Sequence, residues 1–511
     1  MAASAQQPVV RVTARLVEVD VVALDKSSRA VTGLAAEDFA LLEDGRPQAI
    51  RFFSASAPTS TPVRAPAQAP TLADGKPLPP DTYSNRAVPS SAPPGVTAIL
   101  IDALNTSYTN QAYARDRLVE FLRKLTPGDR LALYALGSHG LRLLHGFTDD
   151  PSELVRLLTD TRDWSSWLGD SPLTVPDHVF YSRAPETLRA LAAIADHLAQ
   201  IPGRKNLLWL SATFPVLFSN WVTRGPVQFA FADELGHLAR HFSNAGMALY
   251  PVDARGLVPD WSYNAQLASH VRFRSLFTRM NPVKTSIEGM QILAANTGGR
   301  AFYNSNDLET SFRRAVEDAR SVYVLGYAPP AQDWDGRFRR IEVTVNRPET
   351  ALLHRRGYFA TDAAKDNGRR KSLLADTLQS PLAATRLGMT AQLVRGGDGG
   401  EWKLRLRVEP GNLTLEKRER EWTGRLEVHY AQQKADGTHG KIDEQSLDMT
   451  LPEDLARKVM RQGLLLTHLF RPRPGVTRMR IVAFDLPSGA FGSLDVPLGE
   501  PGRADPVPPR M

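Results

Sequence analysis

The chain has 511 residues, 42% of them hydrophobic and 23% charged, and its formal net charge at pH 7 is +7. This length suits about three domains, and the basic residues alternate with acidic ones instead of forming a block, which disfavours nucleic-acid binding. The absence of cysteine excludes disulfides, thiol catalysis and cysteine-ligated metals. No apolar run reaches the roughly 18 residues that a membrane-spanning helix needs.

The first part of the sequence shows strands with one apolar face. Valines alternate with acidic residues over 17–21, and two apolar strands flank the turn signal at 43–46. Residues 8–54 are too few to bury a core alone, so we expect them to pair with strands elsewhere. The next segment, 55–95, is rich in Pro, Ala, Ser and Thr and predicts an extended connector, of which only the end near Tyr83 docks locally.

The centre of the chain alternates between strand and helix patterns. Residues 96–101 form an apolar run that ends at Asp102, as a buried central strand of a parallel sheet does at its carboxyl end. Further strands are expected at 130–136, 205–211 and 248–253, and helices at 114–125, 188–198, 229–242 and 308–319. The alternation predicts a doubly wound α/β domain over 96–320, with a ligand site at the carboxyl edge of its sheet.

The pattern changes from helical to alternating after residue 320. Three strands are expected over 321–360, and they are the best partners for the amino-terminal strands. The α/β domain would then be an insertion within one β-sandwich. A polar connector is expected over 361–390, and short strands separated by turns predict a second, immunoglobulin-like sandwich over 391–499.

Several motifs along the chain resemble those of one family. They lie at 31–34, 43–45, 99–102, 126–133, 203–211, 250–256 and 325–327. Together they resemble the von Willebrand factor type A domain and, more closely, the bacterial VWFA-related domain proteins of the acidobacterial type. The resemblance covers roughly residues 10–360 and implies protein binding or adhesion.

The resemblance also implies a divalent-cation site after the first strand of the α/β domain. Type A domains commonly use Asp-x-Ser-x-Ser, a Thr from a second loop and a later Asp. Asp102 and Thr106 match that pattern, whereas Leu104 replaces a hydroxyl residue and Ser211 stands where an acid is expected. The lost ligand and charge weaken the site, so we expect either no cofactor or Mg²⁺ bound weakly by Asp102 and Thr106.

The residues expected to contact a partner are polar side chains at the strand ends. They are Asp102, Asn105, Thr106, Ser138, Ser211, Thr213 and Asp253. Asn105 and Asp253 would lie near enough to supplement the metal site, and the simpler alternative is that Asp102 and Asn105 cap the next helix. No catalytic residue is assigned, because Ser138 and His139 lack the spacing of a nucleophile elbow and no phosphate-binding glycine motif is present.

We therefore expect an exported, non-enzymatic protein-binding or adhesion protein, periplasmic or extracellular. The residues at 2–8 resemble the small-residue end of a removed secretory signal, and the alternative is an ordinary frayed terminus of a cytoplasmic protein. The partner is a protein, and self-association is a further option. Two alternatives remain: an envelope assembly scaffold, and a hydrolase of unrecognised type at the same edge, which would have only Asp102, His139 and Asp253 as titratable groups.

Overall fold

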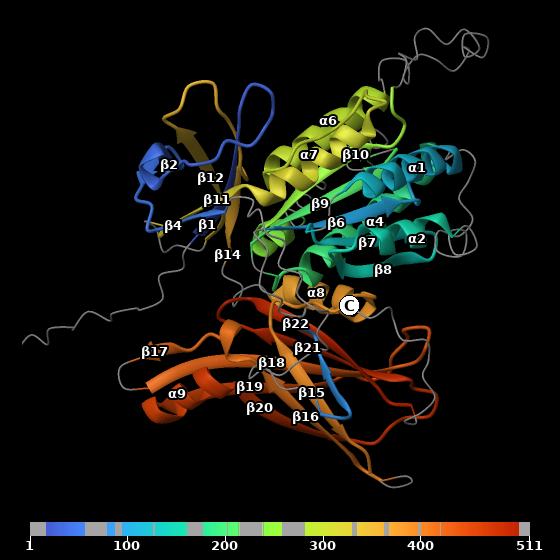
Figure 1. Ribbon diagram of the computed structural model, residues 1–511. Helices are drawn as coiled ribbons and strands as arrows, with labels where there is room; N and C mark the ends of the chain where they lie inside the picture. Colours follow the sequence, from blue (N-terminus) through green and yellow to red (C-terminus); the bar gives the residue numbers. More distant parts are fainter. Residues whose placement is uncertain are drawn as a thin grey trace, which may run out of the picture.

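The computed structural model describes residues 17–56, 79–86, 95–125, 128–160, 177–201, 203–212, 214, 238, 240–257, 282–329, 335–361, 367–396, 400–418 and 421–499. They form an amino-terminal β-sandwich, an α/β domain, and a carboxyl-terminal part with two sheets and two α-helices (Figure 1). In the described part of the chain, no helix combines the length and the apolar character that crossing a membrane requires.

The amino-terminal sandwich combines strands from both sides of the α/β segment. Its sheets have the strand orders β13-β1-β11-β4 and β14-β12-β2-β3. These strands are β1 (Val17–Leu24), β2 (Phe39–Glu43), β3 (Arg46–Gln48), β4 (Phe52–Ser56), β11 (Val322–Tyr327), β12 (Asp335–Val345), β13 (Ala351–Leu353) and β14 (Gly357–Thr361), and the 3-10 helix η1 (Ala36–Asp38) precedes β2. β1 is antiparallel to β11, with Val17 opposite Tyr327 and Val21 opposite Tyr323. The expected pairing between the first strands and those after residue 320 is present.

Glu43 links the two sheets of this sandwich. Its buried carboxylate accepts hydrogen bonds from the hydroxyls of Tyr327, in one sheet, and Tyr358, in the other. Burial and the bond to Glu43 raise the pKa of Tyr327, which keeps the phenol protonated as a donor. A buried carboxylate is costly unless it is hydrogen-bonded, so these two phenols are what permits an acid here.

The α/β domain has a five-stranded sheet of order β10-β9-β6-β7-β8, in which only β8 is antiparallel to its neighbour. Its strands are β6 (Gly95–Asp102), β7 (Leu131–Gly137), β8 (Gly140–Thr148), β9 (Arg204–Ser211) and β10 (Met247–Asp253). Its helices are α1 (Tyr108–Lys124), α2 (Pro151–Thr159), α4 (Asp177–His197), α6 (Pro282–Thr297) and α7 (Leu308–Arg320).

Helices cover both faces of this sheet, as the alternation predicted. Ile99 and Ile101 of β6 belong to a core with α1, α2 and α7. Ala98 and Leu100, which point to the opposite face, belong to a core with α4 and α6. β8 was not expected, because this strand lies at the sheet edge and its polar residues obscure the apolar run.

The carboxyl-terminal part has one sheet of order β20-β16-β15-β5 and a second in which β17, β18, β21 and β22 follow in order and β19 also pairs with β18. The strands are β5 (Thr82–Ser84), β15 (Met389–Val394), β16 (Trp402–Val408), β17 (Glu416–Arg418), β18 (Glu421–Gln433), β19 (Asp443–Pro452), β20 (Leu464–Phe470), β21 (Arg478–Asp485) and β22 (Ala490–Pro497). The helices are α8 (Asn367–Gln379), η7 (Pro410–Asn412) and α9 (Glu453–Gln462).

β5 lies at the end of 55–95 near Tyr83, where docking was expected, but it docks as a strand beside β15 in the carboxyl-terminal sheet and not locally. The next residue, Asn85, is fully buried. Its amide donates to the carbonyls of Ala384 at 2.8 Å and Leu387 at 3.0 Å and accepts from the Met389 N–H at 2.7 Å. Composition could not reveal the partners of this segment, because they lie about 300 residues away in sequence.

The connector expected at 361–390 also contains regular secondary structure. It contains α8, which lies between the carboxyl-terminal sheets and the α/β domain (Figure 1). Leu378 of this helix belongs to a small core with Val482 and Phe484 of β21. The apolar stripe on α8 was too short to outweigh the polar residues around it in the sequence.

Candidate functional site

The carboxyl edge of the parallel sheet is built around Asp102, the last residue of β6. Its fully buried carboxylate accepts four hydrogen bonds. Oδ1 accepts from the Asn105 N–H at 3.0 Å, and Oδ2 accepts from Asn105 Nδ2 at 2.8 Å, Trp209 Nε1 at 3.0 Å and Ser211 Oγ at 2.9 Å. Burial raises the pKa of Asp102, and these donors oppose that rise. The carboxylate thus joins β6 to β9.

The loop after Asp102 is held by its own polar side chains. Thr106 Oγ1 accepts from the Ala212 N–H at 3.0 Å, and Gln111 Nε2 donates to the Thr106 carbonyl at 2.6 Å. Ser107 precedes α1 without a side-chain capping bond. Asp102 and Asn105 therefore do not cap this helix, as the simpler alternative expected, although Asp102 does accept from a backbone N–H, that of Asn105.

These residues do not fit a divalent cation. Oδ2 of Asp102 already accepts from three donors, and the Thr106 hydroxyl is engaged with the backbone. The guanidinium of Arg183 donates to the carbonyl of Leu104, which places a positive charge beside the loop. Asn105 Oδ1 is buried without a hydrogen-bond partner among the described residues, but one amide oxygen is too few ligands for Mg²⁺.

Asp253 is held by its own loop, apart from the Asp102 carboxylate. Arg255 donates to it through Nε at 2.8 Å and Nη2 at 2.7 Å, one bond to each carboxylate oxygen, and the Arg255 N–H adds a third bond at 3.0 Å. Asp253 is buried and Arg255 is largely so. The pair satisfies the charge at the end of β10.

The exposed part of this edge differs from the set of residues predicted from sequence. Ser138 is exposed in the turn between β7 and β8, whereas Asp102, Asn105, Thr106, Ser211 and Asp253 are buried, and Thr213 lies outside the described residues. Sequence reasoning missed Tyr108, which is 56% exposed at the start of α1, and Leu257, which is 61% exposed after β10. Their signal was weak: Tyr108 lies outside the apolar stripe of its helix, and Leu257 follows Gly256 in a loop.

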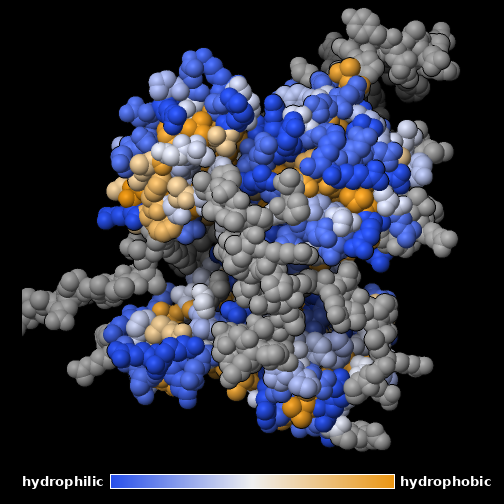
Figure 2. All heavy atoms as spheres, viewed as in Figure 1, coloured by the Kyte–Doolittle hydropathy of each residue, from blue (hydrophilic) through white to orange (hydrophobic). Residues whose placement is uncertain are grey.

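We call Tyr108, Ser138 and Leu257 the rim. The Leu257 N–H donates to Asn306 Oδ1 at 2.8 Å, so its loop is fixed against the segment before α7. In Figure 2 the visible face of the α/β domain is mainly hydrophilic with small apolar areas. His139, beside Ser138, is exposed, and among the described residues it shows no hydrogen bond to Asp102 or Asp253.

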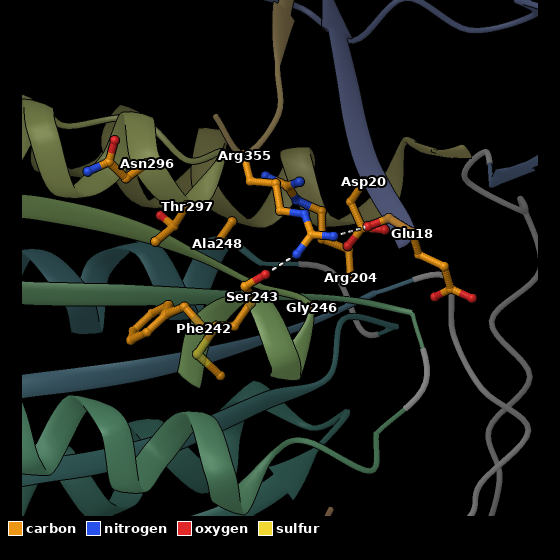
Figure 3. Close-up of a pocket in the computed structure, with 11 residues that line it drawn as sticks. Glu18, Asp20, Arg204, Phe242, Ser243, Gly246, Ala248, Asn296, Thr297 and Arg355 are labelled. Atoms are coloured by element: carbon orange, nitrogen blue, oxygen red, sulfur yellow. Dashed lines mark hydrogen bonds between the residues drawn. The ribbon is translucent and has the colours of Figure 1, made fainter. Parts of the chain in front are cut away.

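A polar pocket lies at the opposite end of the sheet, where β1 meets the α/β domain (Figure 3). Arg355 donates to Ser243 Oγ and to the Glu18 carbonyl at 2.6 Å. Arg204 is buried and donates to Tyr250 Oη at 3.1 Å and to the Gly298 carbonyl at 2.6 Å. Because the bond from Arg355 to Ser243 crosses the boundary between the sandwich and the α/β domain, we interpret the pocket as part of the joint between the two domains.

Lys205, beside this joint, should make stability depend on pH. Its buried Nζ donates to the carbonyls of Ile201 at 2.6 Å and Gly203 at 2.8 Å, and burial lowers its pKa from 10.5 to about 8, against the charges of Asp20 and Glu18. The pKa of Lys205 is lower in the folded state than in the unfolded state, so the unfolded state binds more protons between about pH 8 and 10.5. The free energy of unfolding is therefore at its full value above about pH 10.5 and decreases as the pH falls to 8.

The measurement is urea unfolding of the wild type and Lys205→Met between pH 7.5 and 10.5. The stability of the wild type relative to the variant should increase by on the order of 3 kcal/mol across this window. Lys441→Met, at an exposed position, should show no such trend. A difference that stays constant with pH would show that Lys205 titrates normally.

Comparison with known proteins gives similarity to solved structures only. No protein-family model matches the sequence, and no curated protein matches it. The structure of an aerotolerance-related membrane protein from Bacteroides fragilis is 14% identical, with 43% of this chain and 98% of that chain covered and a TM-score of 0.26. A von Willebrand factor type A protein from Catenulispora acidiphila is 11% identical, with 73% of each chain covered and a TM-score of 0.26.

A third solved structure, the SpRpn10 VWA domain, is 15% identical, with 31% of this chain and 74% of that chain covered and a TM-score of 0.20. Solved structures similar to the chain thus include von Willebrand factor type A domains. Sequence identities and TM-scores this low assign neither an activity nor a partner to this chain. The description of the fold given above is based on its own strand order and strand register.

Proposed function

We propose that the protein is an exported, non-enzymatic protein-binding or adhesion protein, and that it binds its partner at the rim without a metal. The observation that carries this proposal is the exposure of Tyr108 and Leu257 above a base of buried side chains that hydrogen-bond to the Asp102 carboxylate. Exposed aromatic and aliphatic side chains on a rigid support suit protein recognition, because burying them costs little side-chain ordering. The motifs similar to the VWFA-related family support the same function.

The residues of the edge divide into two roles under this proposal. Ser138 contacts the partner beside Tyr108 and Leu257, since its side chain is exposed. Asp102, Asn105, Thr106, Ser211 and Asp253 fix the loops from beneath, through the bonds described above. Recognition at such a rim depends on apolar contact and shape, and therefore does not require a bridging cation.

The test is affinity capture from an envelope extract of the native source, with the full chain as bait. The wild type should recover one stoichiometric protein partner, also in the presence of a chelator, and Leu257→Ser and Tyr108→Ser together should lose it. Leu465→Ser is the matched control, because Leu465 is also 61% exposed but lies on β20, in the carboxyl-terminal part.

Equal recovery by the wild type and the rim variant would overturn the rim as the binding site. Loss of the partner when the chelator is added would show that partner binding depends on a metal ion. Turnover of a hydrolase substrate panel would favour the enzyme alternative, and recovery of the chain itself would favour an assembly scaffold.

A further inference from the structure

The carboxyl-terminal part brings three metal-ligating side chains together on two neighbouring strands. Glu427 and His429 are two residues apart on β18 and therefore point to the same face of the sheet. His429 pairs in register with Glu444 of β19. One ligand atom from each of the three residues lies within 4.8 Å of the others.

Two of these ligands are held nearly out of water. The side chains of His429 and Glu427 are 6% and 13% exposed, and His429 Nε2 lies 2.7 Å from Glu427 Oε1. Arg370 of α8 contacts the other oxygen, Glu427 Oε2, at 3.2 Å, and the His429 ring packs edge-on against Phe484. The imidazole and one carboxylate oxygen are thus oriented by the protein.

The third ligand leaves the cluster accessible. Glu444 is exposed on β19, so an ion can reach the pair from solvent. With a neutral imidazole, the two carboxylates and the guanidinium of Arg370 sum to one negative charge, which favours a cation. The chain contains no cysteine, so no thiolate competes for a soft or borderline metal.

We propose that Glu427, His429 and Glu444 form a Zn²⁺ site that joins β18 to β19. A nitrogen and two carboxylate oxygens suit zinc, whereas Mg²⁺ and Ca²⁺ prefer oxygen ligands alone. Three protein ligands leave a fourth position for water. Zinc bonds of about 2.0–2.1 Å in a tetrahedral arrangement hold neighbouring ligands roughly 3.3 Å apart, so the contact between His429 and Glu427 must open by only about half an ångström.

Arg370 keeps its place on Glu427 Oε2 in this arrangement and orients the carboxylate, as outer partners do around bound metals. The imidazole binds in its neutral form, so zinc competes with protons for the site. This site is independent of Asp102, which lies in a different domain and in a network that does not fit a cation.

The experiment is calorimetric titration of ZnCl₂ into the full chain, after chelator treatment and removal of any affinity tag. The wild type should bind one Zn²⁺, His429→Gln should weaken binding at least 100-fold, and Glu444→Gln at least 10-fold. His439→Gln, at an exposed histidine in the same part, should leave affinity unchanged, and MgCl₂ should produce no binding at this site.

Absence of one-to-one binding in the wild type would overturn the proposal. Because His429 is buried, circular dichroism should first establish that His429→Gln is folded. If it is not, Glu444→Gln decides, since that side chain is exposed: undiminished zinc binding in this variant would also overturn the site.

Discussion

Asp102→Ala should destabilise the α/β domain by about 3–5 kcal/mol, because several buried donors lose an acceptor at once. The carboxylate is the common acceptor for Asn105, Trp209 and Ser211, so its loss removes an acceptor from all three, although Asn105 Nδ2 still donates to Thr187 Oγ1 at 2.8 Å. Each unsatisfied buried donor costs about 1–3 kcal/mol, and rearrangement recovers part of this. Urea unfolding at pH 7, followed by circular dichroism, measures the change.

Ser211→Ala is the matched control, because it removes one donor from the same carboxylate and should cost only about 1 kcal/mol. Calorimetric titration of the same two variants with Mg²⁺ and Mn²⁺ also tests the expectation that Asp102 binds a divalent cation weakly or not at all. If Asp102→Ala kept its stability and lost a tight one-to-one metal site, Asp102 would be a ligand and not a structural centre.

The sequence predicts most of the α/β core, because buried strands and helices have local periods. The apolar run ending at Asp102 is β6, and the stripes at 114–125 and 308–319 lie in α1 and α7. The turn signal at 43–46 is equally local: Asp44 and Gly45 both have positive φ, 48° and 77°, as a two-residue hairpin turn requires.

The contacts that decide the role of the site could not be predicted in this way. Position alone placed Asp102 at the sheet edge, but the indole that binds its carboxylate belongs to Trp209, 107 residues away. A side-chain hydrogen bond across a sheet leaves no periodic signal in either segment. The same holds for the zinc ligands, where spacing puts Glu427 and His429 on one face but only the register of β18 with β19 adds Glu444.

The solvent exposure of residues at the sheet edge could not be predicted from their polarity. A polar residue at a strand end suggested an accessible ligand, yet Asp102, Asn105, Thr106, Ser211 and Asp253 are buried, because loop backbones and neighbouring strands need their hydrogen bonds, and Ser138 alone of the described set is exposed. Tyr108 and Leu257 are accessible for the opposite reason, since both lie outside the apolar clusters that the described residues of this domain form. The exposure of each residue therefore has to be taken from the structure. Here the apolar residues Tyr108 and Leu257 are exposed, and most of the polar residues predicted from sequence are buried.

Arg255→Ala should destabilise the protein by about 3 kcal/mol, because it leaves the buried carboxylate of Asp253 with only the Arg255 backbone N–H as a donor. Asp253→Asn combined with Arg255→Gln removes both charges and should recover most of that loss, since a neutral pair avoids burying an isolated ion. Urea unfolding of the wild type, the single variant and the double variant measures both steps.

The same variants also show whether the Asp253 carboxylate takes part in partner binding. Under the proposed function the double variant keeps its partner in the capture experiment, because Leu257, and not the Asp253 carboxylate, makes the contact. If Arg255→Ala were as stable as the wild type while the double variant lost the partner, Asp253 would bind the ligand directly. The edge would then be a charged recognition site, and the apolar residues Tyr108 and Leu257 would be secondary to it.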